Sequence, residues 1–269
     1  MQEDTKGLIS AVVITKNSSE YLERALKSIK EQTYPSVELV VIDNYSSDNT
    51  LEIARRFTDK VFLKGPERCA QLNYGVEVSR GEFIFKTAGD IIVGKDAFKE
   101  AVGLIQSGWG MVEINCLPDV NISIWAKIRF AEWSCYLDKD SHGVNVMRKK
   151  DFLEAGGYDE RLVAGEDYDL MLRLWKRGLR STDTKNSLMF HLGEPKTLTE
   201  IVKKNVYYGG TLREYFNANG QAGYFATLPF HKSHWRHRDN FIRGGVKVTF
   251  GFLLYQYVRY ASSIIGILK

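Results

Sequence analysis

Two adjacent carboxylates, Glu166 and Asp167, stand at the start of a predicted helix, where acid–base chemistry could be built. The helix is indicated by apolar residues at the spacing of one helical face: Leu170, Met171, Leu174 and Trp175. A glycine corner at Gly156–Gly157 precedes it and would let another molecule approach closely. Acids in a first helical turn often only offset the helix dipole and accept from free amides. The alternative is that one of them faces a cleft as a general base, kept ionised by the helix terminus.

A second group of polar residues follows predicted strands directly. Thr15 comes after the apolar run at residues 8–14, and Asp43 closes the run at residues 38–42. Asp43 begins the polar turn DNYSSD, so one interpretation is a turn-forming and helix-capping aspartate. The other is that its carboxylate accepts from a base N–H or a ribose hydroxyl of a nucleotide lying across the strand ends. The sequence alone leaves both open.

The tetrapeptide Thr87-Ala88-Gly89-Asp90 follows another predicted strand. Its glycine would let the backbone approach a ligand, and its single acid could bind a divalent ion. Hard cations on a diphosphate need few protein ligands, because phosphate oxygens and water complete the shell. His191, after SLMF, could be a second ligand from another strand end, although an isolated histidine is more often an ordinary surface or core residue.

The elements that must position these residues alternate regularly in the first part of the chain. Strands are predicted at residues 8–14, 38–42, 61–63 and 82–86, with helices after Asn17, after Asp48 and over 67–79. This alternation predicts an α/β fold with a mostly parallel sheet and helices on both faces, with ligands at the carboxyl ends of the strands. We expect further strands at 111–115, 143–147 and 187–190, and a helix or ordered loop at 125–137 beside the site.

Composition bounds the class of protein. The chain has 269 residues, 44% hydrophobic and 26% charged, which is typical of one large globular domain or a domain with an appendage. A net charge of +4 is too small to indicate nucleic acid as a partner. The three widely spaced cysteines favour reduced thiols, and the polar, acidic start MQEDTKG argues against a secretory signal. We therefore expect a cytoplasmic location.

Five motifs, in this order, resemble the family 2 inverting glycosyltransferases with the GT-A fold, a Rossmann-like architecture. They are VVITKN (12–17), VIDNYSSDNT (41–50), RCAQLNYGVEVSRGEFIF (68–85), the AGD triplet ending at residue 90, and GGYDERLVAGEDYDLMLRL (156–174). The likeness covers about residues 8–195. It implies an enzyme that moves a sugar from a nucleotide-diphosphate sugar, by default a UDP-sugar, to a hydroxyl.

The resemblance also implies a role for each matching residue. The nucleotide-sugar would be bound by Thr15, Asn17, Asp43, Arg68, Asn73, Ala88 and Gly89. Asp90, with His191 as a further ligand, would hold Mn²⁺ or Mg²⁺ against the diphosphate. Asp167 would be the general base, and Glu166 beside it would orient the acceptor. One departure is Ala88, which stands where the family usually has the first acid of its DxD, so we expect weaker nucleotide binding or a changed metal dependence.

The C-terminal part is predicted to differ from the rest, and we expect a catalytic domain at residues 1–225 and a helical extension at 226–269. Residues 231–243 interleave basic and aromatic side chains, and the helical stretch that follows is amphipathic. Its apolar stripe comprises Phe250, Leu253, Leu254, Tyr257, Val258, Ala261, Ile264, Ile265 and Leu268. Gln256, Arg259, Ser262 and Ser263 lie opposite. The stripe could pack on the catalytic domain. It could instead lie in the interface at the inner face of the cell membrane, which would suit a polyprenyl-linked or other glycan acceptor.

Two other functions are compatible with such a sheet. A sugar nucleotidyltransferase would need a glycine-rich, lysine-bearing signature near the first strand, and VVITKNSSE lacks the glycines. A non-catalytic module that binds a nucleotide-sugar or a glycan is favoured by the loss of an acid at Ala88.

Overall fold

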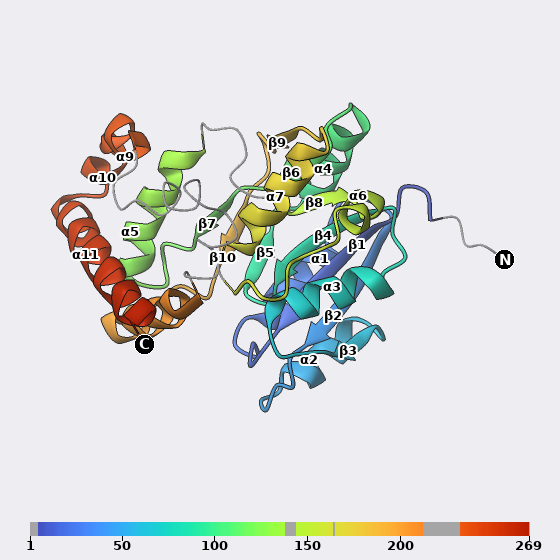
Figure 1. Ribbon diagram of the computed structural model, residues 1–269, viewed down its shortest axis with the longest axis horizontal. Helices are drawn as coiled ribbons and strands as arrows, with labels where there is room; N and C mark the ends of the chain where they lie inside the picture. Colours follow the sequence, from blue (N-terminus) through green and yellow to red (C-terminus); the bar gives the residue numbers. More distant parts are fainter. Residues whose placement is uncertain (1–4, 138–143, 164, 212–231, 269) are drawn as a thin grey trace. The chain divides into compact units, whose positions relative to one another are not determined.

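The computed structural model describes residues 5–137, 144–163, 165–211 and 232–268 (Figure 1). The chain divides into two compact units. The first comprises Met1–Cys116, Asp140–Glu160 and Glu166–Phe190, and the second Leu117–Lys139, Arg161–Gly165 and His191–Lys269. The predicted boundary between residues 225 and 226 lies outside the described residues. That boundary stays a prediction, and in the observed division residues 117–137 belong with the C-terminal helices.

A seven-stranded sheet in the order β3-β2-β1-β4-β8-β6-β9 forms the centre of the first unit. Its strands are β1 (Ile9–Thr15), β2 (Val37–Asp43), β3 (Val61–Leu63), β4 (Phe83–Ala88), β6 (Met111–Glu113), β8 (Val146–Arg148) and β9 (Ser181–Asp183). All neighbours pair in parallel except β8, which runs antiparallel to β4 and β6. A smaller sheet has the order β5-β10-β7, with β5 (Ile91–Val93), β7 (Cys116–Pro118) and β10 (Met189–His191). The predicted mostly parallel sheet is confirmed.

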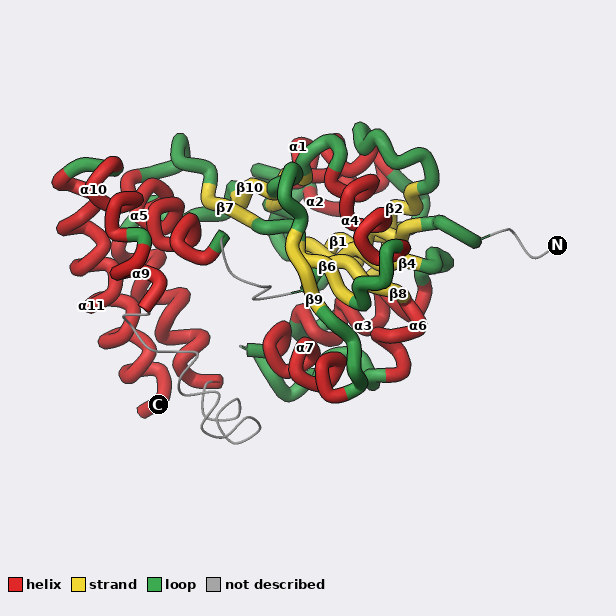
Figure 2. The backbone as a smooth tube through the Cα atoms, turned by 90° about the horizontal axis from the view of Figure 1, so that it is seen from above, coloured by secondary structure: helices red, strands yellow, loops and turns green. Residues whose placement is uncertain are grey.

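Helices cover both faces of the large sheet, as Figure 2 shows. They are α1 (Leu22–Lys30), α2 (Thr50–Phe57), α3 (Arg68–Val78), α4 (Ala97–Gln106), α6 (Lys149–Glu154) and α7 (Glu166–Lys176). Successive side chains of β1 point to opposite faces of the sheet, and each face has its own hydrophobic core. Val13 points to one face, where it packs with α1, α2 and α4, while Val12 points to the other, with α3, α6 and α7. The predicted α/β class is therefore confirmed.

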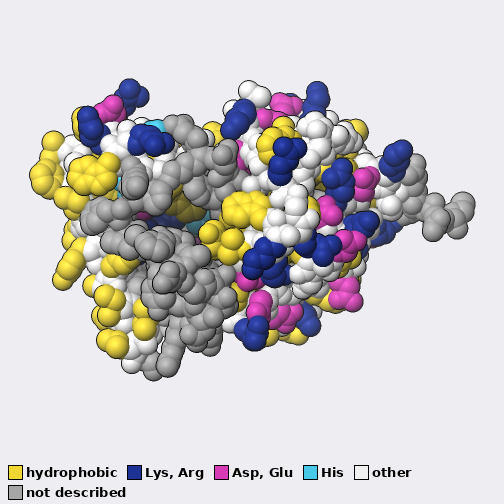
Figure 3. Space-filling model, turned by 45° about the horizontal axis from the view of Figure 1, so that its top comes forward, with side chains coloured by type: hydrophobic (Ala, Val, Ile, Leu, Met, Phe, Trp, Pro, Cys, Tyr) yellow, Lys and Arg dark blue, Asp and Glu magenta, His cyan; other side chains and the backbone are white. Residues whose placement is uncertain are grey.

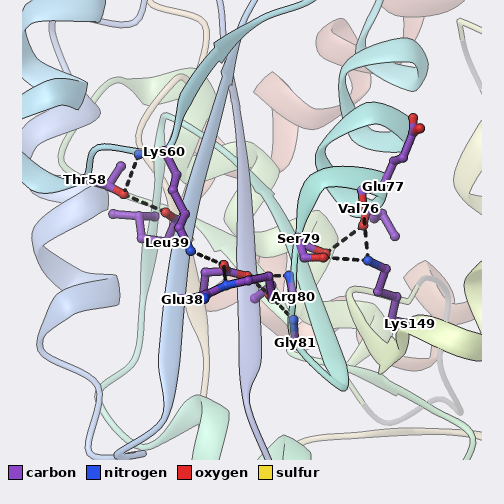
Figure 4. Close-up of polar contacts among 11 residues, drawn as sticks. Glu38, Leu39, Thr58, Lys60, Val76, Glu77, Ser79, Arg80, Gly81 and Lys149 are labelled. Carbon is purple, nitrogen blue, oxygen red and sulfur yellow. Dashed lines mark hydrogen bonds and ion pairs between the residues drawn. The ribbon is translucent and has the colours of Figure 1, made fainter. Parts of the chain in front are cut away.

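A buried carboxylate, that of Glu38, lies near the amino ends of β1, β2 and β4 (Figure 4). It accepts from Ser10, from Lys60, and from both the backbone N–H (2.8 Å) and the Nε (3.0 Å) of Arg80. Burial alone would raise the pKa of Glu38, but these bonds outweigh burial and lower it to about 2. All these partners are residues of the chain itself, and the candidate ligand residues lie at the opposite ends of the strands. We therefore infer that Glu38 stabilises the fold.

The second unit is helical. It contains α5 (Ile124–Trp133), a 3₁₀ turn at Ser134–Tyr136, a helix over residues 198–211, α9 (Lys232–Arg236), α10 (Arg238–Arg243) and α11 (Val246–Leu268). Its core joins α5, α10 and α11 through Ile128, Phe241, Val248 and Phe252. The helix or loop expected at residues 125–137 is thus mostly α5.

The long helix α11 packs with the face opposite to its apolar stripe. Gln256 and Ser262 are buried, and the Gln256 amide donates to Glu132 of α5 (2.8 Å). Except for Val258 and Ala261, the residues of the predicted stripe are exposed. The interpretation in which the stripe packs on the protein is therefore not supported within the described residues. A search of those residues finds no helix long and apolar enough to cross a membrane.

Candidate active site

The carboxyl ends of β1, β2 and β4 lie together at one edge of the large sheet. Thr15 pairs with Asp43 in register, and Ile14 pairs with Ala88. The Thr15 hydroxyl donates to Asp43 Oδ2 (2.7 Å), while Ser46 donates its hydroxyl to Oδ2 (2.5 Å) and its N–H to Oδ1 (2.7 Å). Asp43 is fully buried. Its carboxylate therefore fixes the turn after β2, and a ligand at this edge would meet that turn.

The loops after β1 and β2 are joined by Asn17. Its Oδ1 accepts from the backbone N–H of Ser47 (2.9 Å), and its own N–H donates to Ser46 Oγ (2.8 Å). Asn17 has a left-handed backbone (φ +48°), and so does Tyr45 (φ +52°). The conformation is rare for a tyrosine and costs about 1 kcal/mol or more. Tyr45 is 64% exposed, so its ring is available to a ligand at this edge.

The turn after β4 packs tightly against the end of β1. A Cβ on Gly89 would come within 2.9 Å of Thr15 Cγ2 and 3.1 Å of Leu22 Cδ1. The sequence predicted that this glycine admits a ligand, whereas the structure shows that the close neighbours are protein side chains. Asp90 follows in the turn between β4 and β5, and Ala88 offers no ligand atom beyond its backbone.

The acidic pair at the start of α7 separates into two environments. Glu166 is buried and its carboxylate contacts the guanidinium of Arg68, the first residue of α3. The Asp167 side chain is 46% exposed, with Oδ2 at 3.9 Å from the Arg68 guanidinium. Glu166 is thus committed to an internal ion pair, and Asp167 is the member of the pair that solvent and an acceptor can reach.

Asp167 is held by two further side chains. Its Oδ1 accepts from Lys86 Nζ of β4 (2.5 Å) and from the Tyr158 hydroxyl (2.7 Å), and Lys86 also lies over the Tyr158 ring (4.9 Å). Burial alone would raise the pKa of Asp167, but the charges of Lys86 and Arg68 and the two hydrogen bonds outweigh it and hold the pKa well below its ordinary value. Burial and the Asp167 charge raise the pKa of Tyr158 well above 10. Asp167 is therefore an oriented, ionised carboxylate beside two cations.

Asn73 of α3 fixes the glycine corner that precedes α7. Its side chain donates to the Tyr158 carbonyl (3.0 Å) and accepts from the Tyr158 N–H (2.8 Å). Gly156 and Gly157 both have left-handed backbones, with φ of +83° and +66°. A Cβ on Gly157 would meet Asn73 Oδ1 at 2.7 Å. Asn73 therefore positions the corner.

His191 belongs to the second unit, where it ends β10. Its Nδ1 lies 2.6 Å from Glu194 Oε1, and the buried Glu194 also pairs with Arg129 Nε (2.5 Å). A carboxylate partner is what orients an imidazole for metal binding. Asp90 supplies the hard oxygen that Mn²⁺ or Mg²⁺ prefers. Within the part of the chain that the structure describes, no three His, Cys, Asp or Glu side chains group as a metal site. A metal held by Asp90 would therefore rely on ligand oxygens and water as well.

Four residues of this site were not predicted from the sequence: Lys86, Tyr158, Tyr45 and Gln71. The Gln71 side chain is buried and donates to the carbonyls of Thr15 (3.1 Å) and Ile42 (2.7 Å), so it ties α3 to the ends of two strands. Lys86 gave a usable signal, since a lysine inside the buried run FIFKTA requires a counter-charge. Tyr45 and Gln71 gave none, because each matters through backbone geometry or a partner distant in sequence.

Residues 10–126 match the protein family described as glycosyl transferase family 2. An uncharacterised glycosyltransferase of Rickettsia conorii is 27% identical over 197 residues, which cover 63% of this chain and 31% of that protein. The poly(ribitol-phosphate) β-N-acetylglucosaminyltransferase TarS of Staphylococcus aureus is 31% identical over 123 residues, 42% of this chain and 21% of TarS. This chain thus matches only about a third or less of each of these relatives.

Two solved structures have the same fold. A mannosyltransferase of Pyrobaculum calidifontis, in complex with GDP-Man and Mn²⁺, superposes with a TM-score of 0.64 at 17% identity, covering 97% of this chain and 86% of that one. TarS residues 1–349 in complex with UDP-GlcNAc superpose with a TM-score of 0.54 at 16% identity, covering 97% and 89%. Both are GT-A glycosyltransferases, and at this identity the likeness concerns the fold alone.

Proposed function

We propose that this chain, which carries a glycosyl transferase family 2 domain at residues 10–126 and has a GT-A fold, is an inverting glycosyltransferase. It would move a hexose-type sugar from a nucleotide-diphosphate sugar to an acceptor hydroxyl. The observation that carries the proposal is Asp167, a half-exposed carboxylate at the start of α7, held in place by Lys86 and Tyr158. An ionised, oriented and accessible carboxylate is what a general base needs.

The proposed step assigns one role to each charged group. The acceptor oxygen bonds to the anomeric carbon on the face opposite the nucleotide, its proton passes to Asp167, and the bond to the diphosphate oxygen breaks with its electron pair on the leaving group. Configuration inverts. Lys86 and Arg68 lie within 4 Å of Asp167 and are the cations nearest to the reaction. A diphosphate that attracts either cation would weaken its hold on Asp167 and raise the basicity of this carboxylate. The ion pair with the buried Glu166 holds the Arg68 guanidinium in position.

The nucleotide would lie across the carboxyl ends of β1 and β2. Thr15, Asn17 and Asp43 form the floor of this edge by fixing the Ser46–Ser47 turn, and Tyr45 supplies an exposed ring for the base. The sugar would extend past Ala88 and Gly89 toward Arg68, with Asn73 holding the corner beyond it. A UDP-sugar is the proposed donor, because TarS, which matches in both sequence and fold, binds UDP-GlcNAc.

We propose Mn²⁺ or Mg²⁺ as cofactor, with Asp90 as a carboxylate ligand and His191 as a candidate imidazole ligand oriented by Glu194. When bound, such an ion neutralises charge on the departing diphosphate. The Pyrobaculum mannosyltransferase was solved with Mn²⁺, which supports a divalent ion in this fold. Since Ala88 contributes no second acid, we expect the affinity for free metal to be low and to rise with the nucleotide present.

The acceptor is proposed to be a hydroxyl of a glycan or of a polyprenyl-linked saccharide, with the protein bound peripherally at the cytoplasmic face of the membrane. The exposed apolar side of α11 supports this location. It would bring the chain to the surface where lipid-linked saccharides are displayed.

Release of nucleoside diphosphate from a panel of nucleotide-sugars, with Mn²⁺ or Mg²⁺, tests the reaction. Asp167→Asn should lower turnover by roughly a hundredfold or more, because the proton acceptor is lost, while nucleotide binding by calorimetry persists. Asp169→Asn is the matched control, since Asp169 lies one half-turn further on and pairs with Arg173 (2.7 Å). Full turnover by Asp167→Asn would overturn the assignment of the base.

Ala88 favours one alternative, a non-catalytic protein that binds a nucleotide-sugar or a glycan. This alternative predicts binding of a nucleotide-sugar in the same calorimetric experiment without release of diphosphate from any donor. It also predicts that Asp167→Asn changes nothing beyond stability.

A further inference from the structure

The side of α11 that faces the rest of its own unit carries polar and charged residues as well as the buried Phe252 and Tyr255. Gln256 and Arg259 both donate to Glu132 Oε1 of α5, at 2.8 and 3.2 Å. The Tyr255 hydroxyl accepts from Arg129, also of α5, at 2.6 Å. These charges are shielded from solvent, since the Glu132 side chain is only 3% exposed. A rotation that hid the apolar side of α11 would leave Glu132 without its partners, so the ion pairs set the orientation of this helix.

Backbone packing reinforces that orientation on the C-terminal half of α11. A Cβ on Gly209, in the helix over residues 198–211, would come within 2.2 Å of the Ser263 carbonyl oxygen. A Cβ on Gly266 of α11 would come equally close to the Val206 carbonyl. Only small residues allow two helices to approach this closely. Ser262, Ser263 and Gly266 thus occupy the contact side, and the large apolar residues between them point away.

The side of α11 that points away is apolar along its whole length. We call it the outer face of α11, and it comprises Phe250, Leu253, Leu254, Tyr257, Ile264, Ile265 and Leu268. Their exposed fractions run from 46% to 81%. Figure 3 shows hydrophobic side chains gathered along the edge of the molecule formed by this helix. A continuous apolar face of this size marks a surface that meets another apolar phase.

Positive charge surrounds the start of this face. Residues 232–247 contain five Lys or Arg and one Asp, a formal charge of +4 that equals the net charge of the entire chain. The remaining residues are therefore balanced, and the excess charge lies in α9, α10 and the start of α11. Arg236, Arg238, Arg243 and Lys247 are exposed, and so are Trp235 (70%) and Ile242 (62%) between them.

We propose that the outer face of α11 lies on the surface of a bilayer rich in anionic lipids, with Arg236, Arg238, Arg243 and Lys247 at the headgroups. The helix would lie along the interface, since Arg259 and its partner Glu132 hold its other side in protein. Anionic headgroups suit this face better than a second copy of the chain, because they would neutralise the excess positive charge of residues 232–247, which a second copy would leave uncompensated. This inference specifies the partner of the membrane location proposed above, and it is independent of the sugar-transfer reaction.

Co-sedimentation of the full chain with vesicles tests the proposal. Vesicles of equal parts phosphatidylcholine and phosphatidylglycerol should bind the chain, and vesicles of phosphatidylcholine alone should bind it much more weakly. The triple variant Phe250→Gln/Leu254→Gln/Tyr257→Gln removes three exposed apolar groups spaced along one side of α11 and should lower binding at least tenfold. Leu63→Gln/Leu153→Gln is the control, because these leucines are also exposed, at 48% and 51%, but belong to the first unit.

A second variant tests the charge. Arg236→Gln/Arg238→Gln/Arg243→Gln should weaken binding to anionic vesicles by roughly a hundredfold, at about fivefold per basic residue near the surface. Arg24→Gln/Lys30→Gln/Arg55→Gln, which makes the same change in net charge at exposed positions of the first unit, should bind as the parent does.

Three results would overturn the proposal: no binding of the parent chain to anionic vesicles, an outer-face variant that binds as well as the leucine control, or charge variants that behave alike. Dimerisation abolished by the outer-face variant, without vesicle binding, would assign the face to self-association instead. Release of nucleoside diphosphate by the same variants distinguishes the two proposals. If the transfer reaction fails, vesicle binding is still expected, and if vesicle binding fails, release should persist.

Discussion

Replacing Glu38 by glutamine tests how the amino ends of the central strands are held together. The substitution keeps the shape of the side chain and removes the charge that Lys60 and Arg80 share. The pKa of Glu38 is lowered from 4.5 to about 2, a difference that corresponds to roughly 3 kcal/mol of stability at neutral pH. Lys60 and Arg80 are partly exposed, at 29% and 49%, so solvent screens the interaction. We therefore expect Glu38→Gln to lower the free energy of unfolding by about 2 kcal/mol.

The pH dependence has a definite sign. A carboxylate whose pKa is lower in the folded protein stabilises it fully above its unfolded pKa, and this contribution is lost as the pH falls through the folded value. The stability difference between the parent and Glu38→Gln should thus be largest above pH ~5 and fall by roughly half near pH 3, as protonation proceeds in the parent. Urea unfolding followed by circular dichroism at several pH values measures this difference.

Glu31→Gln is the matched control, because Glu31 makes an exposed pair with Lys27 (3.7 Å) and should change stability by less than about 0.5 kcal/mol. Equal effects of the two substitutions, or a loss in Glu38→Gln that is the same at pH 7 and at pH 3, would refute the assignment of Glu38 as a buried stabilising charge.

Three other outcomes are expected. Lys86→Met should raise the pKa of Asp167 toward its ordinary value, so the acid limb of the pH–rate profile for diphosphate release should move to higher pH; an unmoved limb would contradict the ion pair as its cause. Gly157→Ala should cost about 2 kcal/mol in urea unfolding, since the position has φ +66° and a Cβ would meet Asn73 Oδ1 at 2.7 Å, whereas Gly103→Ala, with open space around it, should be neutral or stabilising. Tyr45→Gly should relieve a left-handed backbone and leave stability equal or up to about 1 kcal/mol higher while weakening nucleotide binding in calorimetry; unchanged binding would remove Tyr45 from the base site.

The strands and the carboxyl-edge residues could be predicted from sequence because their signals are local. The run ahead of Thr15 is apolar on both faces, and such a run indicates a strand buried within a parallel sheet. Asp167 could be placed at a helix start for the same reason. That Asp167 is the counter-charge of Lys86 could not be predicted, since this hydrogen bond between β4 and α7 joins residues 81 positions apart.

The packing of α11 shows a second limit of prediction from the sequence. The period of its apolar residues predicted a helix with two unlike sides, and the structure has that helix. Which side packs inward depends on Glu132, whose carboxylate lies 124 positions before Gln256 in the chain. An isolated amphipathic pattern favours burial of the predicted stripe, but here the side that carries Phe252, Tyr255 and the partners of Glu132 packs inward. The same long-range pairing explains why α5 groups with the C-terminal helices and not with the sheet.

The helix α3 supports three parts of the candidate active site at once. Gln71 binds the ends of two strands, Asn73 binds the backbone beyond the glycine corner, and Arg68 binds the acid next to Asp167. A small shift of this one helix would therefore displace both the strand ends proposed to bind the nucleotide and Asp167, the proposed proton acceptor. Substitutions in α3 that are meant to change the donor should therefore disturb turnover as well. Substitutions in the loop that carries Tyr45 should alter the donor preference without moving Asp167.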